Sequence, residues 1–170
     1  MTRQDFMLKW FFYGLSLLPV WWLEAFVLNR FPLFGVIPML LPVAAVAVAV
    51  LEGAVGGAGF GLFTGMLCDA VYHGGHGGFT LGLCLLCCAA GALSQYVLRP
   101  NFGGCVLCAG LSLAAIDAGR VFLGLFTGLA PLPSLLRVAV PEVLWSLCFV
   151  LLLWPWFSWV RRRIVKKLRL

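Results

Sequence analysis

The chain has 170 residues, of which 63% are apolar and 11% are charged, and its formal net charge is +6. Soluble globular proteins contain about 45–50% apolar and about 25% charged residues. So few charges cannot solvate the surface of a soluble fold of this size. The high apolar fraction also excludes a disordered chain, a collagen-like chain and a small secreted disulfide scaffold. The composition is that of an integral membrane protein.

Six segments are apolar and long enough to predict membrane-spanning helices, which need about 20 mostly apolar residues, with a range of about 17–25. Short turn-like segments connect them, and no soluble domain interrupts the series. We therefore expect one all-α membrane domain, a bundle of six transmembrane helices. The turn at Glu52-Gly53 is so short that five spans stay open as an alternative. The predicted spans cover residues 7–29, 35–51, 53–71, 79–98, 102–126 and 136–160.

The basic residues predict the orientation of the chain. With six spans, one side of the membrane collects nine Lys and Arg residues, whereas the other side has Arg30 and Arg137. Cytoplasmic loops carry the excess of basic residues, so both termini are predicted to be cytoplasmic. Residues 161–170 then form a basic tail at the anionic leaflet, an interpretation we prefer to nucleic-acid binding because a membrane helix directly precedes them. The nine are Arg3, Lys9, Arg99, Arg161, Arg162, Arg163, Lys166, Lys167 and Arg169.

The third span carries a regular series of glycines. Gly53, Gly57, Gly61 and Gly65 recur at every fourth position, and Asp69 takes the next step. Positions four apart lie along one ridge of a helix. Glycines there let a second helix approach closely, which is how helices associate in lipid. Two interpretations stay open: the ridge packs against another helix of the same chain, or Gly57, Gly61 and Gly65 dock the membrane helix of a partner.

Besides Lys9 and Arg137 at the ends of spans, five ionisable residues lie inside the predicted spans, where each costs about 2.5–3.5 kcal/mol at mid-membrane on insertion scales. In the predicted orientation, a rise of about 1.5 Å per residue places all five in the outer half of the membrane. Asp117 and Arg120 are three positions apart on one helix and can pair. We predict an intramembrane polar cluster, either a structural network that pairs its own charges or an outward-open cavity for a ligand or partner. Its members are Glu24, Asp69, Asp117, Arg120 and Glu142.

The remaining reactive side chains do not form a catalytic pattern. Two C-x-x-C spacings, at residues 84–87 and 105–108, would indicate zinc in a soluble loop. They lie in uncharged helical segments, where cysteine packs as a small apolar residue. His73 and His76 occupy a glycine-rich turn, and we interpret them as solvated loop residues rather than a metal site or a pH sensor. We therefore expect no enzyme activity, no metal and no cofactor.

The third and fourth spans resemble a known family. Residues 52–69 are similar to the G-x-x-x-G-F-x-x-G-L-x-x-D stretch of the MreD family of bacterial rod-shape-determining membrane proteins, with residues 65–69 at its G-L-L-x-D. After a glycine turn, residues 79–83 are similar to the family's G-x-x-x-L-G segment. Pro38 and Pro42 in the second span, the total length and the basic tail agree with the same family.

The resemblance implies a fold similar to the substrate-binding subunits of energy-coupling-factor vitamin transporters. It also implies a non-enzymatic scaffold role in bacterial cell-wall elongation, in the cytoplasmic (inner) membrane. The implied partners are MreC, whose single membrane helix would dock on the chain, the cytoskeletal MreB, the glycosyltransferase RodA and the elongation transpeptidase. A vitamin-binding transporter subunit is the alternative function. Such subunits carry an A-x-x-x-A face in the first span, whereas residues 7–29 contain only Ala25, which favours the scaffold.

The orientation can be tested by labelling single cysteines placed at Gly75 and Arg99 in a background without the seven native cysteines. A membrane-impermeant thiol reagent added outside the cell is expected to label position 75 and not position 99, because an odd number of spans separates them. Labelling of both positions from the same side would contradict the six-span topology.

Overall fold

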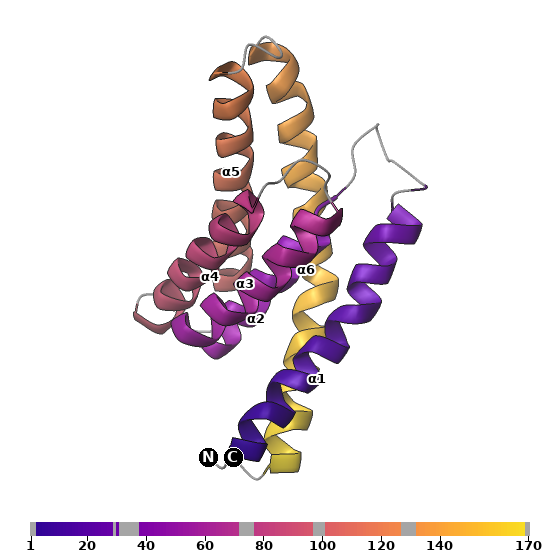
Figure 1. Ribbon diagram of the computed structural model, residues 1–170, viewed down its shortest axis with the longest axis vertical. Helices are drawn as coiled ribbons and strands as arrows, with labels where there is room; N and C mark the ends of the chain where they lie inside the picture. Colours follow the sequence, from indigo (N-terminus) through magenta and orange to yellow (C-terminus); the bar gives the residue numbers. More distant parts are fainter. Residues whose placement is uncertain are drawn as a thin grey trace.

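The computed structural model describes residues 3–28, 30, 38–71, 77–96, 101–126 and 132–168. Within these ranges the chain is helical and has no strand, so the expected all-α class is confirmed (Figure 1). The helices are α1 (Arg3–Trp22), its π-helical continuation η1 (Leu23–Leu28), α2 (Leu40–Glu52), α3 (Ala54–Val71), α4 (Gly78–Tyr96), α5 (Phe102–Phe126) and α6 (Leu132–Leu168).

Four helical segments are long and apolar enough to cross a membrane: Met7–Leu28, Gly78–Tyr96, Phe102–Phe126 and Ala139–Lys166. The two other apolar helices are shorter, and α2 has only 13 residues. At about 1.5 Å per residue, α2 is about 20 Å long, which is less than the ~30 Å hydrocarbon core of a bilayer. Four of the six predicted spans are therefore long and apolar enough to cross a membrane, and α2 is shorter than the span expected over residues 35–51.

Helix α2 is the centre of the fold. Every residue from Leu40 to Leu51 is buried, as expected for a helix that is apolar on all sides. It contacts α1, α3, α4, α5 and α6. The longer helices instead point large apolar side chains outward, among them Leu15, Phe122 and Leu151. Such an outer surface suits contact with lipid, while the short helix supplies the interior of the bundle.

The glycine ridge of α3 packs against α4. A Cβ atom built on Gly61 would lie 2.6 Å from the carbonyl oxygen of Leu83, and one on Gly65 would lie 2.5 Å from the Cα of Thr80. A Cβ on Gly57 would lie 2.7 Å from the carbonyl oxygen of α4 residue 87. The prediction that Gly57, Gly61 and Gly65 dock a partner's helix is therefore wrong. The chain's own fourth helix occupies that ridge, because three missing side chains let the two backbones touch.

A single residue, Gly53, separates α2 from α3. Its φ of 87° lies in the region that favours glycine, so the chain can reverse within one residue. The Gly53 amide donates to the carbonyl of Ala49 at 2.8 Å, and the Ser94 hydroxyl of α4 donates to the carbonyl of Val50 at 2.7 Å. These bonds satisfy carbonyls at the end of α2. The turn at Glu52-Gly53 thus joins two separate helices.

Helices α1 and α5 lie beside different parts of the long helix α6 (Figure 1). The N-terminal half of α1 lies along the C-terminal half of α6, at the end of the molecule where both chain ends are found (Figure 1). Helix α5 lies along the beginning of α6, at the opposite end (Figure 1). Helix α2 contacts the helices of both pairs, while α3 packs on α2 and α4.

We expect Gly61→Leu to destabilise the protein by about 3 kcal/mol or more, because the new side chain overlaps the α4 backbone, which cannot move aside as a flexible side chain does. Thermal unfolding in detergent measures this loss. Gly82→Leu is the matched control, since nothing lies within 4 Å of a Cβ at that position, and its effect should be within about 0.5 kcal/mol. Equal stability of Gly61→Leu and the wild type would contradict the packing.

Candidate functional site

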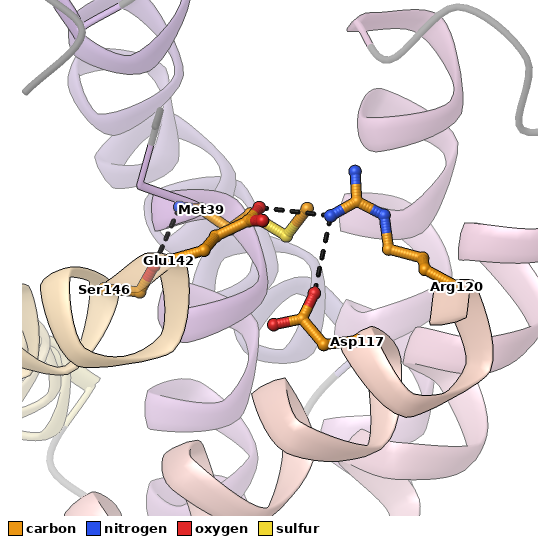
Figure 2. Close-up of polar contacts among 5 residues, drawn as sticks. All are labelled: Met39, Asp117, Arg120, Glu142 and Ser146. Carbon is orange, nitrogen blue, oxygen red and sulfur yellow. Dashed lines mark hydrogen bonds and ion pairs between the residues drawn. The ribbon is translucent and has the colours of Figure 1, made fainter. Parts of the chain in front are cut away.

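Three of the five predicted cluster residues meet in one ionic network (Figure 2). The Arg120 Nη1 atom of α5 lies 3.4 Å from Asp117 Oδ1 and 3.1 Å from Glu142 Oε1 of α6. The two carboxylate side chains are only 9% and 10% exposed, whereas the Arg120 side chain is 43% exposed. The Arg120 guanidinium also lies 5.7 Å from the centre of the Phe79 ring of α4. One cation therefore links three helices.

Helical spacing explains how these groups come together. Asp117 and Arg120 are three positions apart on α5, and Glu142 and Ser146 are four apart on α6, so each pair lies on one face of its helix. The Ser146 hydroxyl accepts a hydrogen bond from the Met39 amide at 3.0 Å (Figure 2). The face of α6 that pairs with Arg120 thus also caps the beginning of α2.

Glu24 occupies a different place, at the N-terminus of α2. It is 2% exposed, and its Oε2 atom accepts a hydrogen bond from the Leu41 amide at 2.8 Å. The first amides of a helix have no partner within the helix, and the helix dipole favours a negative group beside them. Glu24 lies within the π-helical turn η1. A widened turn of this kind often marks a special site in a helix, and here it carries the carboxylate that caps α2.

Asp69 caps the N-terminus of α4. Its carboxylate accepts hydrogen bonds from the Thr80 amide at 3.0 Å, from the Phe79 amide at 3.3 Å and from the Thr80 hydroxyl. Asp69 lies four residues after Gly65, on the same face of α3. The close packing at the glycines and the cap formed by Asp69 therefore both join α3 to α4. The residues that carry the family resemblance therefore form one structural unit, which fixes α3 against α4.

The predicted cluster is thus divided. Asp117, Arg120 and Glu142 share one network, while Glu24 and Asp69 each bind the beginning of a different helix. All four acids accept hydrogen bonds from groups of the chain itself. The interpretation as a network that satisfies its own charges describes this arrangement better than a cavity open for a ligand.

Glu52 is a polar centre that sequence reasoning missed. Its carboxylate accepts a hydrogen bond from the Tyr13 hydroxyl at 2.6 Å and forms an ion pair with Lys9. The Arg161 Nε atom lies 3.9 Å from the same carboxylate. Glu52 therefore joins α1, α2 and α6. The position of Glu52 between two apolar segments is a signal in the sequence, but the same position next to Gly53 also predicts an ordinary turn residue.

The cysteines do not assemble a binding site in the described part of the chain. All seven are free, and Cys68, Cys87, Cys105 and Cys108 are buried. Among the described residues, no group of three or more His, Cys, Asp and Glu side chains could hold a metal ion. His73 and His76 lie outside the described residues.

Comparison of the chain with protein-family models, with curated proteins and with solved structures finds no match. The function of the chain is therefore inferred from its residues and from their arrangement in the structure.

Arg120→Leu should lower the thermal stability in detergent more than Asp117→Asn or Glu142→Gln. Loss of the Arg120 guanidinium leaves two nearly buried carboxylates without their cation. We expect this to lower the free energy of unfolding by about 2 kcal/mol, after allowance for the exposure of Arg120. Each amide variant keeps a hydrogen-bonding group, so a loss of about 1 kcal/mol is expected. Arg137→Leu, which removes an exposed arginine of α6, is the control. The network is contradicted if Arg120→Leu is no more destabilising than Arg137→Leu.

Proposed function

We propose that the chain is a non-enzymatic membrane scaffold subunit of the bacterial cell-wall elongation complex, of the MreD type, which binds the membrane helix of MreC. The observation that carries this proposal is a groove of about 710 Å³ between α1 and α3. The groove lies on the side of α3 away from the buried glycine ridge. A partner helix can approach the backbone closely in this groove, whereas α4 already covers the glycine ridge.

The walls of this groove are apolar and include small residues. Gly14 of α1 and Gly59 of α3 both line it, and a Cβ atom on either glycine would meet nothing within 4 Å. Val55 is 90% exposed in the same groove. Without a hydrophobic drive in lipid, helices associate by close packing at small residues. Large apolar side chains that flank the glycines, Phe11, Leu18 and Phe63, can hold a single transmembrane helix between them.

The polar groups of the chain support a scaffold over the alternative, a vitamin-binding transporter subunit. Glu24 and Asp69 bind amides at the beginnings of α2 and α4, and Arg120 binds Asp117 and Glu142. These groups are already engaged in holding helices together. A site for a polar vitamin needs convergent polar groups that face a pocket. The proposed partners beyond MreC are MreB, RodA and the elongation transpeptidase, and the proposed location is the cytoplasmic (inner) membrane with both termini cytoplasmic.

Gly59→Leu should abolish or weaken co-purification with co-expressed MreC at least about tenfold, because a leucine fills the groove where the helices would meet. The variant should stay folded, since the new side chain enters open space. Gly82→Leu is the control, because this position of α4 is equally open but lies outside the groove.

Two outcomes would contradict the proposal. Unchanged co-purification of MreC by Gly59→Leu would remove the docking site, and failure of wild-type protein to retain MreC would remove the scaffold function. Thermal stabilisation of the wild-type protein by a vitamin would favour the transporter subunit instead.

A further inference from the structure

A second groove of about 710 Å³ lies between α1 and the C-terminal half of α6. Its volume is within the range of about 300–1,000 Å³ that is usual for small-molecule sites. Phe12 and Pro19 of α1 and Trp156 and Val160 of α6 contribute apolar walls. The groove is therefore lined by both helices, and it adjoins the groove beside α3, because Leu15 of α1 lines both.

The same groove is basic towards the C-terminal end of α6. Arg163 and Lys166 line it there, seven and ten residues beyond Trp156, which corresponds to about 10–15 Å along the helix. The Arg163 guanidinium lies 4.9 Å from the centre of the Trp159 ring, so an aromatic side chain holds it in place. Among the described side chains, neither Arg163 nor Lys166 pairs with a carboxylate. Within the described part of the chain, these two cations therefore have no counter-charge at this end of the groove.

The neighbouring contacts fix the spacing of the two walls. Glu52 binds Lys9 and Tyr13 of α1 and lies 3.9 Å from Arg161 of α6, one residue from Val160. Both helices are therefore tied to the same carboxylate beside the groove. This separates Arg163 and Lys166 from Arg161, whose charge is turned towards Glu52.

We propose that the α1–α6 groove binds one anionic phospholipid, with an acyl chain along the apolar walls and the headgroup phosphate between Arg163 and Lys166. The charge pattern favours this occupant over a partner's helix, because an apolar helix would leave both cations without a counter-charge. A free phosphate would leave the apolar part of the groove unfilled. Basic pockets between membrane helices at the cytoplasmic side bind anionic headgroups by this combination of contacts.

The test compares phosphatidylglycerol with phosphatidylcholine on the delipidated full chain in detergent, by native mass spectrometry and thermal unfolding. We expect one bound phosphatidylglycerol, and a rise in Tm of about 3–5 °C when the lipid is in tenfold excess over its Kd. Phosphatidylcholine should bind more weakly, because its headgroup carries no net charge. Equal binding of the two lipids would show general lipid contact and overturn the proposal. Glycerol phosphate, which has no acyl chain, should not stabilise the protein, and equal stabilisation by it would also overturn the proposal.

Arg163→Gln and Lys166→Gln should each weaken phosphatidylglycerol binding about fivefold, the effect of one basic side chain near an anionic headgroup. Arg162→Gln is the matched control, because Arg162 is exposed on the same turn but does not line the groove. The specific site is supported if Arg162→Gln keeps the wild-type affinity. An equal loss in all three variants would show diffuse attraction to the basic tail and overturn the site. Lys166→Gln decides the question if Arg163→Gln does not fold.

Discussion

The fold depends on burying a helix that is too short to cross the membrane. Every residue of α2 from Leu40 to Leu51 is buried, so the free amides and carbonyls at its two ends cannot be left to water. Glu24 and Ser146 accept from the amides of Leu41 and Met39 at its beginning. At its end, Ser94 and the Gly53 amide donate to its last carbonyls. Groups from η1, α4 and α6 thus fix where α2 lies, and the surrounding helices are positioned by the same bonds.

The acids of the predicted polar cluster are neutralised in two ways. Glu24 and Asp69 bind the beginnings of α2 and α4, where the helix dipole and the free amides supply positive potential without a cation. Asp117 and Glu142 share one arginine instead. Four acids can therefore be accommodated with a single basic side chain among them. Glu24, Asp69 and Glu142 each connect two elements, so these three charges also specify helix contacts, whereas Asp117 binds Arg120 on its own helix, α5.

The sequence predicted the helices well and their contacts only in part. Apolar length and the short turns located six helical segments, because these signals are local. The four-residue spacing identified the glycine ridge, but spacing along α3 contains no information on which helix covers it, and the structure places α4 there. The rise per residue predicted a similar membrane depth for the five charged residues. It could not predict that Asp69 and Arg120 have different partners, because the partner of a side chain depends on the direction in which that side chain points. Glu52 was missed because Lys9 lies 43 positions away in the sequence.

Helix α1 and its continuation η1 are attached to α2 through one carboxylate at each end of α2. Tyr13 binds Glu52 at the end of α2, and Glu24 binds the amide of Leu41 at its beginning. The two separations match, because Tyr13 and Glu24 are 11 residues apart, as are Leu41 and Glu52. Because antiparallel helices rise by the same distance per residue, both contacts, Tyr13 with Glu52 and Glu24 with Leu41, can form at the same time. Between these contacts, α1 is bordered by an apolar groove beside α3 and a partly basic groove beside α6. A partner's helix in the first groove and a phospholipid in the second would both pack against α1, while Glu52 and Glu24 keep α1 and η1 in register with α2.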